Sequence, residues 1–222
     1  MKCWICGNEA TTGEHKTKAS DLRALYNGVS QKNPLYLHTD ERRNQKVGSI
    51  KSDKFKFDSL ICANCNNART ASHDKAWEKI SKFLREIKPP IKKGDEISLE
   101  KVFSTDFSES MLDVHLFFVK LFGCAIVELK TPIDISPFAE AILQKRYHPK
   151  VFLAFGSSLD MGTGMTNIQT VNIDDSCVYA TWFYIVEPIA VNVIYAEPSE
   201  KREGLVHAWH PSTISKCIYA GF

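Results

Sequence analysis

The sequence lacks the features that would assign it to a secretory route, a membrane or a nucleotide-dependent enzyme. Residues 1–4 lead straight into a cysteine pair, without the apolar segment of a signal peptide. The most apolar run, residues 116–129, is interrupted by Lys120 and Glu128 and is too short to span a bilayer. No P-loop, dinucleotide fingerprint, internal repeat or low-complexity tract occurs. We therefore expect a soluble, cytoplasmic protein with no membrane partner.

Charge is divided unevenly along the 222 residues, a length that suits one large domain or two small ones. Residues 1–93 carry 19 Lys and Arg against 10 Asp and Glu, a net charge of +9. Residues 94–222 carry 9 against 16, a net charge of −7. A basic first half suits a polyanionic partner, whereas a phosphate backbone would repel the acidic second half. The charge reverses at a linker-like segment, so we predict one domain over 1–93 and a second over 94–222.

Hydrophobic periodicity predicts an α+β fold. The first half has strand patterns at 11–17, 35–39 and 55–61, and helix patterns at 19–28 and from 65 to about 88, where two prolines stop the helix. The second half has a buried helix at 111–129 and a helix starting at Ser136 and Pro137. Strands follow at 151–155, 168–173, 177–186 and 189–196, with Glu187 and Pro188 as a hairpin turn and weaker candidates at 205–209 and 215–219. The second domain should therefore contain an antiparallel sheet.

The cysteines indicate a metal site. Four of the seven form two Cys-x-x-Cys pairs, Cys3 with Cys6 and Cys62 with Cys65. A reducing compartment disfavours disulfides, and two such turns supply the four soft ligands of tetrahedral zinc. Structural zinc binds with roughly 10–16 kcal/mol, enough to stabilise a region with little core of its own. Four thiolates leave no position for a catalytic water, so the zinc is structural. The other three, which we expect to be buried thiols, are Cys124, Cys177 and Cys217.

Polar residues beside the two pairs suggest where chemistry could occur. Glu14 and His15 follow the first pair, and Asn66 follows the second directly. If zinc clamps the pairs together, the strand with Glu14 lies beside the helix that begins near Asn66. A carboxylate and an amide oxygen suit a hard divalent cation, and a neutral imidazole near pH 7 can take a proton from water. The alternative is an ordinary surface dipeptide at Glu14 and His15 and a helix-capping role for Asn66.

These motifs resemble the HNH endonucleases, a family of ββα-metal nucleases. The resemblance rests on both cysteine pairs, on Glu14-His15, and on Asn66-Asn67-x-Arg69-Thr70 followed by Asp74-x-Ala76-Trp77, and it covers about residues 1–88. It implies a zinc-bound ββα-metal domain that hydrolyses DNA with one divalent ion, Mg²⁺ or Mn²⁺. It also implies Glu14 as a ligand of that ion, His15 as general base, and Asn66 as the second ligand, where many relatives have histidine.

Further residues would contact the substrate in such an enzyme. Arg69 lies one turn beyond Asn66, where it could contact a phosphate, and Asn67 lies beside it. His73 and Asp74 lie about two turns beyond Asn66 on the same side of a continuous helix. The implied substrate is double-stranded DNA, with RNA as the alternative. Restriction, phage defence and a mobile element all remain open as the biological setting.

The sequence departs from the family pattern in two places. The family usually has an asparagine a few residues before the second cysteine pair, where this chain has Asp58 and Ser59. The spacer from His15 to Cys62 is also longer than a ββα unit needs. The insertion in this spacer is rich in cations, which either form a solvated face or contact a DNA backbone. These cations are Arg42, Arg43, Lys46, Lys51, Lys54 and Lys56.

The missing asparagine keeps a second function open. A zinc-stabilised module of nuclease-like fold, without activity, would bind nucleic acid or protein and act through its second domain. The role of residues 94–222 is not assigned by any motif. A homodimer through this domain is one hypothesis, because two single-metal sites would cut both strands. Sedimentation at micromolar concentration tests it, and a monomer would contradict it.

Overall fold

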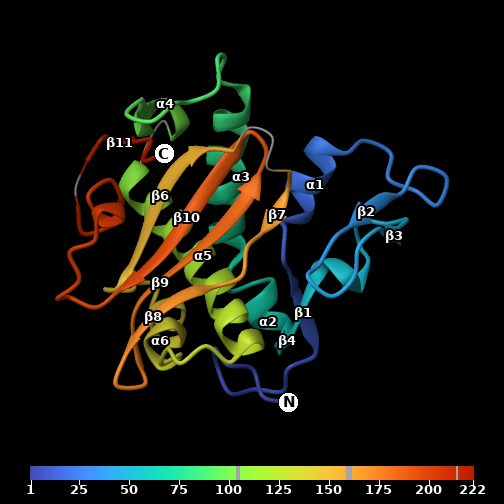
Figure 1. Cartoon of the computed structure of the whole chain (residues 1–222), viewed down its shortest axis with the longest axis horizontal. Coiled ribbons are helices and arrows are strands. Elements are labelled where there is room, and N and C mark those ends of the chain that lie inside the picture. Colours follow the sequence, from blue (N-terminus) through green and yellow to red (C-terminus); the bar gives the residue numbers. More distant parts are fainter. Residues whose placement is uncertain (104–105, 159–161, 214) are drawn as a thin grey trace.

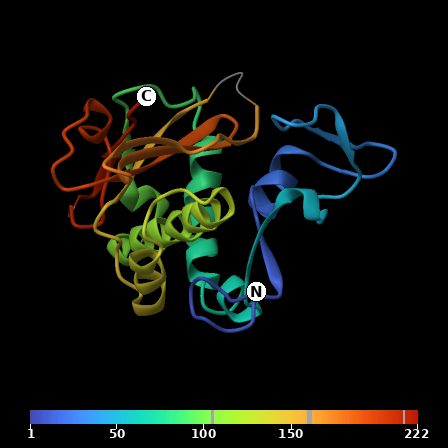
Figure 2. The same ribbon diagram turned by 60° about the horizontal axis from the view of Figure 1, so that its bottom comes forward.

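The computed structural model describes residues 1–103, 106–158, 162–213 and 215–222, and shows a layer of sheet with helices packed behind it (Figure 1, Figure 2). The helices are α1 (Ala19–Leu25), α2 (Ala63–Asn66), α3 (Ala71–Glu86), α4 (Leu99–Val102), α5 (Phe107–Leu129) and α6 (Ser136–Gln144), with 3₁₀ turns at Asp53–Phe55 and Glu203–Leu205. The strands are β1 (Thr12–His15), β2 (Leu35–Leu37), β3 (Gln45–Val47), β4 (Lys56–Ile61), β5 (Glu96–Ser98), β6 (Val151–Ser157), β7 (Gly164–Met165), β8 (Gln169–Ile173), β9 (Ser176–Val186), β10 (Ile189–Ala196) and β11 (Cys217–Tyr219). The mixture of helices and antiparallel sheets confirms the predicted α+β class.

The main sheet is antiparallel and belongs to the second half of the chain. Its strands run in the order β6-β10-β9-β7, and β8 also pairs with β9. Ile189 of β10 pairs with Val186 of β9, so the predicted hairpin turn at Glu187 and Pro188 is confirmed. Alternate residues of β9 are buried, as expected for a strand with one face on the core; they are Ala180, Trp182 and Tyr184.

Helix α5 is the central helix of the core. It is long and apolar enough to cross a membrane, yet 83% of its most apolar window is buried inside the fold. A soluble protein's core helix has these properties, because a helix that is apolar all round must be covered on every side. The predicted buried helix is therefore confirmed, and it begins four residues earlier than the sequence pattern indicated.

One hydrophobic core includes residues from both predicted domains. Trp77 of α3 stacks on Phe117 of α5, with ring centroids 5.5 Å apart, and makes edge contacts with Phe118 and with Tyr184 of β9. The Trp77 indole also donates to Asp21 of α1, 2.7 Å away. Because α3 precedes the predicted boundary and α5 follows it, the second half supports the elements that carry the candidate site.

The helix predicted from Cys65 to about residue 88 is interrupted. Helix α2 ends at Asn66 and α3 starts at Ala71, with a turn between them. Thr70 holds this turn, because its buried hydroxyl donates to the carbonyl of Cys65 over 3.0 Å. The interruption changes the direction of the chain, so His73 and Asp74 do not continue the face of the helix that carries Asn66.

The insertion between His15 and Cys62 forms α1 and an arm, defined here as residues 28–56. Its strands β2 and β3 form a separate two-stranded ribbon, which lies to the right of the main sheet in Figure 1. The arm shares a small apolar cluster with α1; its buried members are Leu22, Val47 and Phe55. This cluster gives the arm a fixed attachment to the body of the protein.

Candidate functional site

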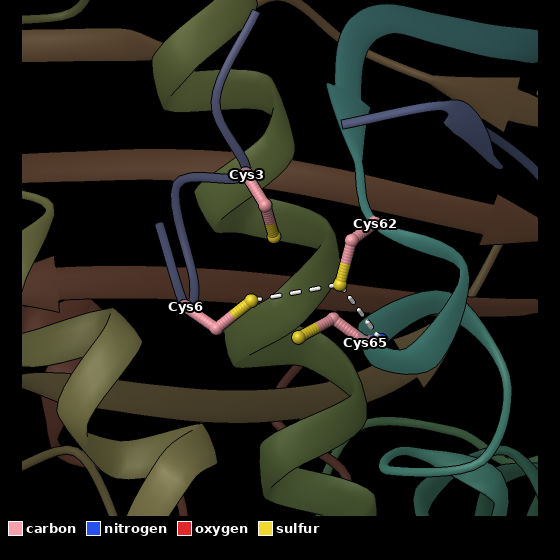
Figure 3. A group of neighbouring side chains, drawn as sticks. All are labelled: Cys3, Cys6, Cys62 and Cys65. Atoms are coloured by element: carbon pink, nitrogen blue, oxygen red, sulfur yellow. Dashed lines mark hydrogen bonds between the residues drawn. The ribbon is translucent and has the colours of Figure 1, made fainter. Parts of the chain in front are cut away.

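The four cysteines of the two pairs converge on one point (Figure 3). Their Sγ atoms all lie within 4.8 Å of one another, and Cys6 and Cys62 are 3.5 Å apart. A tetrahedron with Zn–S bonds of about 2.3 Å has edges of roughly 3.8 Å, so the cluster has the size that zinc requires. All four are free thiols. The cluster fits the predicted structural zinc.

Both cysteine pairs have the backbone of a metal knuckle. The amide of Gly7 donates to the carbonyl of Cys3 over 2.8 Å, and Gly7 has a φ of +75°, which a residue with a side chain rarely adopts. In the second pair, the amide of Cys65 donates to Sγ of Cys62 over 3.4 Å. That bond is the main reason that the pKa of Cys62 is lowered to about 7, which favours the thiolate that zinc binds.

The first knuckle is fixed to α5 through Trp4. A Cβ atom on Gly123 would lie 2.4 Å from the Trp4 ring, so only glycine admits the indole here. The first cysteine knuckle therefore packs against the helix of the second half.

Glu14 and His15 lie at an irregular point of the β1–β4 pair. Gly13 pairs with Leu60 but His15 pairs with Lys56, so β4 accommodates extra residues opposite Glu14. Such an irregularity re-aims side chains that would otherwise alternate across the sheet. Glu14 points into the protein and is 5% exposed, and its Oε1 accepts from the amide of His15 over 2.9 Å.

A lysine of α5 reaches the Glu14 carboxylate. Lys120 is fully buried, and its Nζ lies 2.6 Å from Oε2 of Glu14, 3.1 Å from the hydroxyl of Thr70 and 3.4 Å from Asp74. Lys18 forms an ion pair with Asp74 at 2.8 Å. Burial lowers the pKa of Lys120, but Glu14 and Asp74 outweigh burial and leave the pKa raised. The site is thus a set of two carboxylates and two ammonium groups, of which Glu14 and Lys120 are buried and Asp74 and Lys18 are half-buried.

Asn66 is brought beside β1, as the zinc argument predicts. Its Nδ2 donates to the hydroxyl of Thr12 over 3.1 Å and to the carbonyl of Gly13 over 3.4 Å. Gly13 itself passes close to β4, because a Cβ there would meet the carbonyl oxygen of Phe57 at 2.8 Å. Asn66 therefore lies one residue from Glu14 along the strand.

Neither Asp58 nor Ser59 takes the place of the family's asparagine. Glu128 of α5 accepts from the backbone amides of both, over 2.5 Å from Asp58 and 3.4 Å from Ser59. The Asp58 side chain is exposed, and the Ser59 hydroxyl donates to the carbonyl of Cys124 in α5. The ring of His15 instead hydrogen-bonds with the backbone of Ile50. Among the described residues no side chain or backbone group pairs with its other nitrogen, Nε2, which is buried. Burial is the main reason that the pKa of His15 is lowered from 6.5.

The expected substrate contacts are dispersed. Arg69 and Asn67 are exposed on the turn after α2. His73 is buried and faces Asp113 of α5 at 3.5 Å, and burial lowers its pKa to about 4. Asp74 belongs to the Lys120 cluster described above. The structure therefore gathers Glu14, His15 and Asn66 around β1, and places His73 elsewhere in the core.

Lys120 and Lys18 are residues of this site that sequence patterns miss, and the clearer case is Lys120. The only signal for it was its place as a cation inside a run of apolar residues, 116–129. A buried ammonium group needs opposite charges, and α5 packs against β4, which brings Lys120 to Glu14 of the neighbouring strand β1. Lys18, three residues after His15, gave no signal at all.

The chain was compared with protein-family models, with curated proteins and with solved structures, and none of them matches it. Among the described residues, the four cysteines are the only group of three or more Cys, His, Asp or Glu side chains close enough to hold a metal together.

Proposed function

We propose that the protein is a metal-dependent endonuclease of the HNH type that hydrolyses phosphodiester bonds in DNA. The observation that carries the proposal is the placing of Asn66 against β1, next to Glu14 and His15, by a four-cysteine cluster of zinc dimensions. The antiparallel β1–β4 pair followed by α2 and α3 has the order of a ββα unit. The net charge of +9 over residues 1–93 suits a polyanionic substrate.

Glu14 and Asn66 are the residues that would hold a catalytic Mg²⁺ or Mn²⁺. An ionised carboxylate has about four acceptor positions, and Glu14 uses two of them, for Lys120 and for the amide of His15. The Lys120 ammonium already compensates the charge of this carboxylate, so an ion would have to share Glu14 with it. When bound, the ion would stabilise the charge that develops on the phosphate oxygens. Oxygen donors of this kind fit a hard cation, and Lys120 competes for one of them.

His15 would act as the general base. Because its pKa is lowered, the ring is neutral at pH 7 and can accept a proton from water. The hydrogen bond with the Ile50 backbone orients the ring, and Nε2 carries no other partner among the described residues. Nε2 is covered in this structure, so a substrate must displace its surroundings to reach it.

The test is nicking of supercoiled plasmid by zinc-loaded protein. Mg²⁺ or Mn²⁺ is added or omitted, and EDTA is used only as a brief quench so that the structural zinc is retained. The proposal expects nicked and linear products only with added metal. Absence of nicking with either ion, at protein concentrations up to micromolar, would contradict it.

A second function is favoured by one observation. Both oxygens of Glu14 already have partners, and Nε2 of His15 is covered. A zinc-stabilised binding module without catalysis would keep this arrangement permanently. Metal-independent binding of duplex DNA, together with no nicking in the assay above, would support this second function.

A further inference from the structure

We propose that the β2–β3 arm is a nucleic-acid-binding ribbon that enters the major groove of duplex DNA beside the candidate site. The choice of partner rests on the proposed function, but the binding surface is argued from the arm itself. The arm carries seven Lys and Arg against three Asp and Glu, a net charge of +4.

Two of the arm's three acidic groups are already engaged, which leaves most of its cations available. Asp53 pairs with Lys56 at 2.8 Å, and Asp40 accepts from Asn167 of the second half at 2.6 Å. Within the described parts of the chain, six exposed cations of the arm have no carboxylate at ion-pair distance; they are Lys32, Arg42, Arg43, Lys46, Lys51 and Lys54. Such groups are suited to neutralise phosphates.

The two faces of the ribbon differ. Leu35, Leu37 and Val47 belong to the apolar cluster shared with α1. On the opposite face Tyr36, 58% exposed, lies directly across from Lys46 in the strand pairing. Lys and Tyr side chains both contact phosphate oxygens of duplex DNA, so this face is suited to the backbone beside a groove.

The size of the ribbon suits duplex DNA. The major groove is about 12 Å wide and accepts a two-stranded β-ribbon. Two paired strands are about 4.8 Å apart, so β2 and β3 with their side chains fit this width. Arg42 and Arg43 lie in the loop at the far end of the ribbon, where they would reach phosphates on either side. A membrane surface is the less suitable partner, because Tyr36 is the one large apolar side chain of the arm that is exposed among the described residues.

The arm leads directly to the candidate site. The backbone of Ile50, near the base of the arm, bonds with the ring of His15, and the amide of Lys16 donates to the carbonyl of Phe55 over 2.6 Å. A duplex held by the arm would therefore extend over β1. The arm is expected to position the scissile strand as well as to add affinity.

The experiment measures binding of a labelled 20-base-pair duplex by fluorescence anisotropy, without added divalent metal, over a series of salt concentrations. The arm variant is Arg42→Ala/Arg43→Ala/Lys46→Ala. The control variant is Lys88→Ala/Lys92→Ala/Lys93→Ala, which removes the same charge from exposed lysines after α3. Thermal melting checks that both variants fold.

The arm variant should bind the duplex at least about tenfold more weakly at 100 mM salt. The slope of the logarithm of the binding constant against the logarithm of salt concentration should fall in magnitude by roughly 2–3, because each phosphate contact contributes about 0.9 to it. The control should change affinity less than about threefold. Equal losses in both variants, wild-type binding by the arm variant, or tighter arm-dependent binding to phosphatidylserine vesicles than to the duplex would overturn the inference.

Binding and cleavage separate the two proposals. Arm-dependent binding without nicking under any metal would reject the proposed nuclease activity and support the proposed role of the arm. If the arm variant nicks plasmid as fast as the wild type and only with added metal, the proposed role of the arm is rejected and the proposed nuclease activity is supported.

Discussion

Lys120 and Glu14 meet at 2.6 Å inside the protein, although they belong to the two halves that the sequence separates by charge. The second half is thus part of the candidate site, through α5. It fixes the carboxylate that a catalytic ion would use, and it supports the zinc knuckle through Gly123. This relationship gives the acidic half of the chain a structural role in the site.

Replacing Lys120 with Met should lower the free energy of unfolding by roughly 3–5 kcal/mol, because it leaves the buried Glu14 carboxylate without its ammonium partner. Urea unfolding followed by circular dichroism measures this change. The exposed Lys201→Met is the control and should change stability by less than about 0.5 kcal/mol. The double variant Lys120→Met/Glu14→Gln should recover part of the lost free energy of unfolding, because the unpaired carboxylate charge is removed. If the losses of the two single variants simply add in the double variant, the Lys120–Glu14 pairing is contradicted.

The purified protein should contain one zinc ion per chain, measured by mass spectrometry of the metal. Cys62→Ser should lower that content and the melting temperature together, because the ion links residues 3–6 to β4 and α2. Cys217→Ser is the matched control, since Cys217 lies outside the cluster. Full zinc content in Cys62→Ser would contradict the assignment.

Stability should fall as pH decreases from 7 to 5. Burial lowers the pKa of His148 to about 4, so below its ordinary value of 6.5 the unfolded chain binds a proton that the folded chain does not. The sign is therefore a loss of stability with acid, about 2 kcal/mol between pH 7 and pH 5 for this residue. Urea unfolding at both pH values measures it. His148→Leu should reduce the pH dependence, and exposed His207→Leu should leave it unchanged.

The rate of DNA cleavage should be level at pH 7–8 and fall on acidification. Its inflection should lie below 6.5, since burial lowers the pKa of His15 and only the neutral ring accepts a proton. Single-turnover cleavage at fixed Mg²⁺ across pH 5–8 measures this profile. An inflection above pH 7 would indicate a different base.

Local patterns predicted most of the secondary structure. The apolar run of α5, the Ser136-Pro137 helix start and the Glu187-Pro188 turn each depend on residues close together in the chain, and each occurs in the structure. Cysteine spacing likewise predicted the cluster of four thiols.

Long-range contacts could not be predicted in this way. The interruption before α3 depends on Thr70, whose hydroxyl serves both Cys65 and Lys120, and periodicity does not register such a bond. His73 shows the same limit: a continuous helix would place it near Asn66, whereas the turn directs it to Asp113. The Lys120–Glu14 pair needs knowledge of how α5 packs, which no local pattern contains.

The most direct test of the central claim compares plasmid nicking by the wild type, His15→Ala and His207→Ala, all zinc-loaded, at pH 7.5 with Mg²⁺ or Mn²⁺. The account predicts that His15→Ala melts near the wild-type temperature and cleaves at least about 100-fold more slowly, because the general base is lost. His207→Ala should cleave like the wild type. Cleavage by folded His15→Ala at the wild-type rate would contradict the account.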